Sequence, residues 1–302
     1  MGTLFRKPVA LTDSGLGPNV SNAISSLHLG RIYLPVLHIV VLAIVQGITE
    51  FLPISSSGHL VLIPVFADWP DQGLIIDVAV HVGTLGAVCL YFWRDMLGMT
   101  AGLLAVTRGR RDPYARLFGL LVLATLPVIA AGYLMERYGM MDGLRSIEII
   151  AWTTFGFGIV LYITDQVGMT VRRVEHIGIV DAIIIGLSQV LALVPGTSRS
   201  GITMSAARML GMERSEAARF SMLLSIPTII GAGTLKGLQL YHSGDAQLTA
   251  DAILAAGLAF GTALVAIFIM MAWLRRATFT PFVLYRIALG GGLLALSYGF
   301  IS

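Results

Sequence analysis

Long apolar segments constrain this sequence more than any other feature. A helix of about 20 residues crosses the hydrocarbon core of a bilayer, and several runs of the chain reach that length. Only 12% of the 302 residues are charged, whereas soluble domains carry about 25%. A soluble fold could not cover so much apolar surface. We therefore predict an all-α polytopic membrane protein with about six transmembrane helices, over residues 77–94, 115–137, 147–165, 217–239, 251–274 and 282–300.

Two further apolar regions, 34–67 and 177–211, are interrupted in the middle by proline, glycine and hydroxyl residues. Proline and glycine stop helices, and irregular backbone at membrane depth must be covered by protein or water. We therefore predict that each region is a re-entrant helix–loop–helix hairpin. The interruptions read Pro53-Ile54-Ser55-Ser56-Ser57-Gly58 and Pro195-Gly196-Thr197-Ser198-Arg199-Ser200-Gly201.

The two hairpins also indicate an internal repeat. A shift of 143 positions places Gln46 on Gln189, Ser55 on Ser198, Ser57 on Ser200 and Gly58 on Gly201. Paired interrupted segments in two halves are typical of repeated membrane folds with a central site. The predicted repeat halves are about 34–165 and 177–302, within a single integral membrane domain over 34–302.

Arginine placement predicts the orientation. If neither hairpin crosses the membrane, the predicted arginine-rich loops 94–116 and 165–176 fall on one side, together with the region 208–219, Arg275 and Arg276. The positive-inside rule makes that side cytoplasmic. The first hairpin then enters from outside and the second from the cytoplasm, so we expect an inverted-topology repeat whose hairpin tips meet near the midplane.

The rest of the composition is less informative. Residues 1–33 are mixed and contain no apolar signal-peptide core, so we expect a flexible or interfacial leader. The net charge of +3 forms no basic stripe with aromatics, which argues against a nucleic-acid partner. The single cysteine, Cys89, is expected only to pack. The Gly290-Gly291-Gly292 run permits close helix packing, and a homodimer is one possible outcome.

The first hairpin carries the segment QGITEFLPISSSGHL, residues 46–60. Gln46 and Glu50 are four residues apart and share a helix face, and a carboxylate in an apolar segment should face a cavity or a partner. Ser56 is a candidate nucleophile and His59 a candidate acid or base. A plain helix–helix interface would explain the serines but not Glu50 beside His59. The neighbouring residues Ser55, Ser57 and Gly58 are expected to contact a ligand.

The second hairpin carries PGTSRSGIT, residues 195–203, with Arg199 as its only deep basic residue. The arginine fork suits phosphate oxygens, and a following helix would point its positive end at an anion. A purely structural pairing of Arg199 with Glu50 is the alternative. The remaining expected ligand contacts are Ser198, Ser200, Gly201 and Thr203.

Together these residues suit a diphosphate. Arg199 would neutralise phosphoryl charge, Glu50 would act as base or hold a divalent cation, and Ser56 or His59 would attack. Asp77 and His81 form another pair four residues apart, which either extends this site or is only an interfacial polar pair.

At these two motifs the chain resembles the undecaprenyl-diphosphate phosphatase family, also called the bacitracin-resistance protein family, and the resemblance extends loosely over about 35–300. It implies an enzyme of the bacterial inner membrane that removes the terminal phosphate of undecaprenyl diphosphate, recycling the lipid carrier of cell-wall synthesis. It also implies help from Mg²⁺ or Ca²⁺, a site open to the periplasm, and activity tied to Glu50, Ser56, His59 and Arg199. The family allows Glu or Gln at Gln46; the Gln here leaves Glu50 as the main acidic residue and weakens a two-carboxylate metal site.

Several alternatives stay open at this stage. The nucleophile is Ser56, His59 or a water activated by Glu50. SSSGH and TSRSG superficially resemble two motifs of the type 2 phosphatidic acid phosphatases. However, that family also requires a Lys-x6-Arg-Pro element and a histidine soon after the second motif, and this sequence has neither. A transporter or flippase for an anionic lipid or small anion would use the same inverted-repeat site, although transport alone would not require the cluster of Glu50, Ser56 and His59.

Overall fold

The structure is a computed structural model that describes residues 35–70, 72–168, 170–241 and 246–299. The predicted leader 1–33 lies outside the described residues. Every regular element in the described part is a helix, as predicted. The α-helices are α2 Val36–Thr49, α3 Ser56–Ala67, α4 Gly73–Tyr91, α5 Trp93–Thr107, α6 Pro113–Arg137, α7 Ile147–Val167, α8 Ile179–Val190, α9 Arg199–Met209, α10 Arg214–Tyr241, α11 Ala246–Leu274 and α12 Thr280–Ser297.

Helices of membrane-spanning length and apolarity confirm the class of protein. In the described part of the chain, α6, α7, α11 and α12 each qualify, and α4 with α5 forms a pair bent by 79° that would count as one further span. The prediction of six spans is not confirmed. Helix α10 covers the expected span 217–239, but the part of it that the structure describes is not apolar enough to qualify, since Arg219 and several hydroxyl residues interrupt it.

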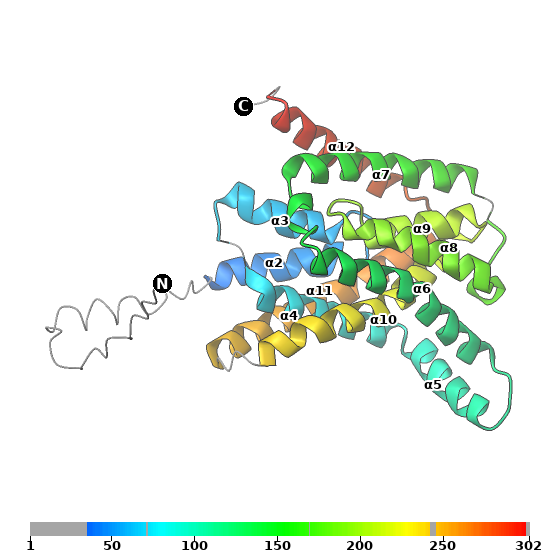
Figure 1. Ribbon diagram of the computed structural model, residues 1–302. Helices are drawn as coiled ribbons and strands as arrows, with labels where there is room; N and C mark the ends of the chain where they lie inside the picture. Colours follow the sequence, from blue (N-terminus) through cyan, green and yellow to red (C-terminus); the bar gives the residue numbers. More distant parts are fainter. Residues whose placement is uncertain (1–34, 71, 169, 242–245, 300–302) are drawn as a thin grey trace, which may run out of the picture. The chain divides into compact units, whose positions relative to one another are not determined.

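The segment 94–116 was predicted to be a loop, and this was wrong for most of its length. Helix α5 occupies Trp93–Thr107, directly after a break at Phe92. Helix α5 packs along α6 (Figure 1). Its tight approach to α6 occurs at Gly102, where a Cβ would lie 2.3 Å from the Asp112 carboxylate. The arginine pattern predicts membrane orientation and carries no information on whether this segment is helical.

Both interrupted regions fold as helix–break–helix units, as predicted. The offset of 143 holds for helix starts as well as for motifs: Val36 and Ile179 begin the first helices, and Ser56 and Arg199 begin the second helices. None of these four helices exceeds 14 residues, so at about 1.5 Å per residue none reaches across a bilayer.

The break in each unit ends in the same serine cap. Ser55 and Ser198 both adopt positive φ, 73° and 72°. The Ser55 Oγ accepts from Gly58 N at 3.4 Å, and the Ser198 Oγ accepts from Gly201 N at 3.1 Å. A non-glycine residue in this region of φ/ψ costs about 1–3 kcal/mol and persists where surrounding structure holds it, often at functional sites.

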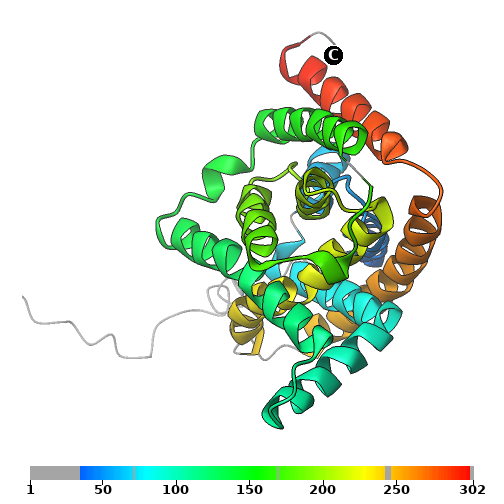
Figure 2. The same ribbon diagram turned by 90° about the vertical axis from the view of Figure 1, so that its right-hand side faces the viewer.

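Helix α9 is the innermost helix. Every residue from Ser200 to Arg208 is buried, and Figure 2 shows this helix with α6, α7, α11 and α12 around it. Outside it, α11 packs along α4 and α2, α12 packs along α7, and α6 packs along α8 (Figure 1). Cys89 packs against the main core as predicted. Gly290 allows α12 to pack closely against α7 within the chain, since a Cβ there would lie 2.7 Å from Phe155 N.

A buried ionic cluster joins the ends of four helices. Asp165, 2% exposed, ends α7; its Oδ1 lies 3.3 Å from Arg208 Nε and 2.6 Å from Arg214 Nε, at the end of α9 and the start of α10. The Asp165 Oδ2 accepts from Phe279 N at 3.2 Å, just before α12. A carboxylate with two guanidinium partners meets the need of a buried charge for compensation.

Close packing at Gly83 gives the first prediction. A Cβ on Gly83 would lie 2.1 Å from the backbone oxygen of Ala256 on α11, so Gly83→Ala should destabilise the protein by about 1–3 kcal/mol through overpacking. Gly119 on α6 has nothing within 4 Å, so Gly119→Ala should be neutral or stabilising by about 0.5–1 kcal/mol. Thermal unfolding of the detergent-solubilised variants measures both effects. Equal unfolding midpoints for Gly83→Ala and Gly119→Ala would contradict the close packing of α4 against α11 at Gly83.

Candidate active site

Glu50 stands where the two hairpin tips meet. It follows α2 directly, is 6% exposed, and its two oxygens are shared between the hairpins. Oε1 accepts from Arg199 Nη2 at 3.0 Å. Oε2 accepts from Ser56 Oγ at 2.7 Å and from Gln46 Nε2 at 2.8 Å. The structure therefore brings together four of the residues that the sequence singled out, and the predicted contact between hairpins is confirmed.

His81 joins this cluster from α4. Its Nε2 lies 3.8 Å from Glu50 Oε2, within reach of an ion pair when the imidazole is protonated. Its Nδ1 bonds the backbone oxygen of Asp77 at 2.6 Å, which orients the ring. The Asp77 carboxylate instead accepts from Gln72 Nε2 at 2.8 Å. Of the pair left open by the sequence, His81 extends the site and the Asp77 carboxylate does not contact Glu50 in the described part.

The predicted ligand-contacting hydroxyls differ in how free they are. Ser55 and Ser198 act as helix caps, and their Oγ atoms lie 3.4 Å from Ser57 Oγ and 3.2 Å from Ser200 Oγ. Ser200 Oγ also bonds the Leu52 oxygen at 2.9 Å. Thr203 Oγ1 bonds Ser221 Oγ at 2.7 Å and the Arg199 oxygen at 2.8 Å. These hydroxyls first stabilise the tips.

Solvent exposure separates the remaining predicted contacts. Gly58 and Gly201 are buried, each is the third residue of its helix, and the backbone N–H of each already donates to the serine cap. Ser57 is exposed, while Ser56 is partly exposed and directed at Glu50. Ser56 is therefore the serine hydroxyl that is both accessible and paired with a carboxylate.

His59 is held apart from this cluster. Its Nδ1 bonds the Ser55 oxygen at 2.7 Å and its Nε2 bonds the Tyr285 hydroxyl at 2.5 Å. Because a carbonyl oxygen only accepts, Nδ1 carries the proton, and Nε2 of the neutral ring accepts from the phenol. Within the described residues no hydrogen bond joins His59 to Ser56 or Glu50. The local geometry therefore favours Glu50 as the proton acceptor for Ser56.

Arg286 supports both tips and was missed by the sequence analysis. Its guanidinium is fully buried and donates to backbone oxygens of both hairpins and of α7. The signal was present, since an arginine inside the apolar segment 282–300 is costly and therefore suggests a function. Its acceptors are Pro53 O at 3.2 Å, Thr154 O at 3.2 Å, Thr153 O at 3.3 Å, Gly196 O at 3.0 Å and Thr197 O at 3.0 Å.

The donor set for a metal ion is small. Among the residues that the structure describes, no group of three or more His, Cys, Asp or Glu side chains is placed to hold one. However, Gln46 Oε1 is buried without a hydrogen-bond partner, beside Glu50. Mg²⁺ at phosphate sites is commonly held by one or two carboxylates together with substrate phosphates. These two residues fit a cation that arrives with a diphosphate.

The charges define what the site can bind. Arg199, 15% exposed in its side chain, begins α9, so the positive end of that helix and the guanidinium coincide. His81, with 38% of its side chain exposed, lies across Glu50 from it. The arrangement can bind a phosphoryl group between a guanidinium and a hydroxyl activated by a carboxylate. Fold and site together define an all-helical protein with apolar helices typical of membrane proteins and a candidate anion-binding site between two matched hairpins.

The comparisons with known proteins identify the family. The model of the family described as Bacitracin resistance protein BacA matches residues 39–292. Undecaprenyl-diphosphatase 1 of Rhodospirillum rubrum is 54% identical over 268 residues, covering 87% of this chain and 95% of the relative. Undecaprenyl-diphosphatase of Ruegeria pomeroyi is 51% identical over 262 residues, covering 86% and 98%. The chain belongs to the bacitracin resistance protein BacA family, which confirms the resemblance seen in the two motifs.

The role of Arg286 gives the second prediction. Arg286→Met removes the donor from five backbone oxygens, and a buried group left unsatisfied costs about 1–3 kcal/mol. We expect a loss of several kcal/mol in stability, seen as a large fall in thermal midpoint in detergent. Arg275→Met, at an exposed position, is the matched control. An unchanged midpoint for Arg286→Met would remove Arg286 from its supporting role.

Proposed function

We propose that this protein is an undecaprenyl-diphosphatase, which hydrolyses undecaprenyl diphosphate to undecaprenyl phosphate and inorganic phosphate and so recycles the lipid carrier of cell-wall synthesis. The observation that carries the proposal is the convergence of Ser56 Oγ and Arg199 Nη2 on the two oxygens of Glu50, at 2.7 and 3.0 Å. A nucleophile, a base and a phosphate-binding cation then lie within one bond network. Curated relatives of the same name support the substrate.

The first half-reaction uses this network directly. The terminal phosphoryl group binds Arg199, and Ser56 Oγ attacks its phosphorus while the serine proton passes to Glu50 Oε2. The bond from that phosphorus to the bridging oxygen breaks, and undecaprenyl phosphate leaves with the electron pair. This leaving group is a stable phosphate anion, so it needs no proton donor. Arg199 stabilises the charge that spreads over the transferred oxygens.

The second half-reaction restores the enzyme. Water attacks the phosphoserine, the bond to Ser56 Oγ breaks, and Glu50 returns its proton to that oxygen. Inorganic phosphate leaves and one proton is released. His59, held by Tyr285 and the Ser55 carbonyl, takes a positioning role at the rim in this scheme. Attack by His59 itself or by a water that Glu50 activates would leave Ser56 dispensable.

A divalent cation, Mg²⁺ or Ca²⁺, is part of the proposal. Glu50 and Gln46 Oε1 would hold it together with diphosphate oxygens. When bound, it neutralises phosphate charge as a Lewis acid. The single carboxylate implies that the cation binds with the substrate and not to the protein alone.

We also propose that the two halves have inverted topology. The matched starts of α2 and α8 and of α3 and α9 support two re-entrant hairpins that enter from opposite sides. The arginine-rich segments then face the cytoplasm, the chain spans the bacterial inner membrane, and the site opens to the periplasm. A periplasmic opening suits a product released outside the cytoplasm.

Phosphate release tests the function. The detergent-purified protein should release phosphate from undecaprenyl diphosphate, and Arg199→Ala, Glu50→Gln and Ser56→Ala should each lower turnover by at least about a hundredfold, as lost transition-state charge stabilisation does. Ser57→Ala is the matched control for Ser56→Ala, and EDTA tests the cation. Folded wild-type protein that binds the lipid but releases no phosphate would favour the transporter alternative. Normal turnover of Ser56→Ala would rule out Ser56 as the nucleophile but would leave the phosphatase function in place.

Cysteine labelling tests the topology. In a Cys89→Ala background, Ala67→Cys at the end of α3 and Arg173→Cys before α8 place one thiol at an outer end of each hairpin. A maleimide that does not cross membranes should label residue 67 and not residue 173 in intact cells, and both after permeabilisation. Labelling of both residues in intact cells would contradict the inverted arrangement.

A further inference from the structure

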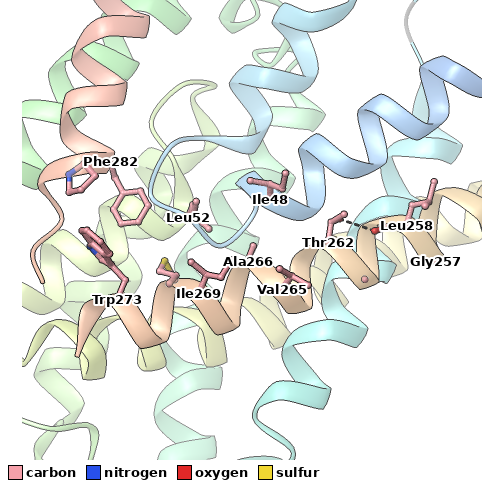
Figure 3. A pocket seen from close by; sticks show the side chains of 13 residues that line it. Ile48, Leu52, Gly257, Leu258, Thr262, Val265, Ala266, Ile269, Trp273 and Phe282 are labelled. Carbon is pink, nitrogen blue, oxygen red and sulfur yellow. Dashed lines mark hydrogen bonds between the residues drawn. The ribbon is translucent and has the colours of Figure 1, made fainter. Parts of the chain in front are cut away.

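A large apolar groove opens beside the candidate active site, between α11 and α12 (Figure 3). Its volume is about 700 Å³, within the range of about 300–1,000 Å³ that small-molecule sites occupy. Side chains of α11 form one wall and the first turn of α12 forms the other. Ile48 and Leu52, from the tip of the first hairpin, point into it from behind.

The chemistry of the lining is hydrocarbon. Thr262 has the only aliphatic hydroxyl among the lining residues, and its Oγ1 already bonds the backbone oxygens of Leu258 at 2.8 Å and Ala259 at 3.3 Å. Gly257 and Gly261 line the groove, and a Cβ at either would meet nothing within 4 Å. The other side-chain donor of the lining, Trp273 Nε1, bonds the Thr278 oxygen at 3.0 Å. The groove therefore offers an apolar hollow with room at two glycines, and both side-chain donors in its lining are already bonded.

Two elements that line the groove also carry residues of the candidate active site. Ile48 and Leu52 lie on either side of Glu50 in the chain, and the Leu52 oxygen accepts from Ser200 Oγ at 2.9 Å. On the other wall, Phe282 lies one helical turn before Tyr285, whose hydroxyl bonds His59 Nε2 at 2.5 Å. Both walls therefore end at elements that carry the site.

We propose that this groove binds the isoprenoid chain of the substrate next to its diphosphate. The inference rests on the proposed function, since the occupant is the tail of the same lipid. A diphosphate between Glu50 and Arg199 must keep its chain out of the polar network, and the back of the same hairpin segment is the apolar surface nearest to it in the chain. The open spaces at Gly257 and Gly261 accept the methyl branches of isoprene units. Binding there favours a branched prenyl chain by the apolar surface it buries.

Filling the groove tests the proposal. A Cβ at Gly261 would meet nothing within 4 Å, so we expect Gly261→Leu to retain the fold. Gly119→Leu adds the same side chain at an equally open position on α6 and is the matched control. With substrate at fixed mole fraction in detergent, Gly261→Leu should raise KM for undecaprenyl diphosphate by about tenfold, the loss expected for about two buried methylenes. Its kcat should stay within about twofold, and KM for isopentenyl diphosphate should not change.

A binding measurement makes the result independent of turnover. A farnesyl diphosphate analogue with a diazirine on its chain should label the peptide containing residues 257–273 in Glu50→Gln protein, and Gly261→Leu should suppress that labelling. Labelling confined to other helices, or an unchanged KM for Gly261→Leu, would overturn the groove assignment while leaving the phosphatase intact. A change of oligomeric state on Gly261→Leu, measured by chemical crosslinking, would reassign the groove to a second copy of the chain. Absence of phosphate release from every substrate by wild-type protein would instead overturn the proposed function.

Discussion

The interactions of Arg286 are the constraint on which the rest of the site depends. Each hairpin breaks its helix at buried residues, and the backbone oxygens there need donors. One guanidinium on α12 supplies hydrogen bonds to Pro53, Gly196 and Thr197 at 3.2, 3.0 and 3.0 Å. The same donor group therefore satisfies and aligns both tips, and Glu50 can meet Arg199 only because the tips are held in this register.

The ion pair between Glu50 and Arg199 explains how the site can be stable and still bind an anion. A buried carboxylate or guanidinium alone is costly, and each neutralises the other. In the proposed mechanism, a diphosphate brings negative charge to Arg199 and competes with Glu50 for it. As the pairing weakens, Glu50 would become a better proton acceptor for Ser56. Binding of the substrate and activation of the proposed nucleophile would then be linked through one carboxylate.

The sequence predicted the hairpins and their meeting, because the signals are local. Proline, glycine and hydroxyl clusters break apolar runs, and the shift of 143 positions aligned Ser55 with Ser198, which adopt φ of 73° and 72°. The features that the sequence did not predict depend on tertiary contacts. The distance of 3.8 Å from His81 to Glu50 requires α4 to pack beside α2. The separation of His59 from Ser56 follows from Tyr285, 226 residues away. The burial of α10 depends on all of its neighbours.

The two hairpins begin their helices at matched positions but carry different side chains at the point where they meet. Ser56 and Arg199 occupy equivalent positions, the first residue of the second helix in each hairpin, and they donate to the two oxygens of the same carboxylate. Glu50 has no acidic counterpart, because the position 143 residues later is Leu193. Gln189, the counterpart of Gln46, instead bonds Ala124 O at 3.4 Å and Thr228 Oγ1 at 3.3 Å. A strictly symmetric pair would place either two hydroxyls or two guanidinium groups at the meeting point. The difference between the halves is therefore what creates a single site with both a nucleophile and a cation.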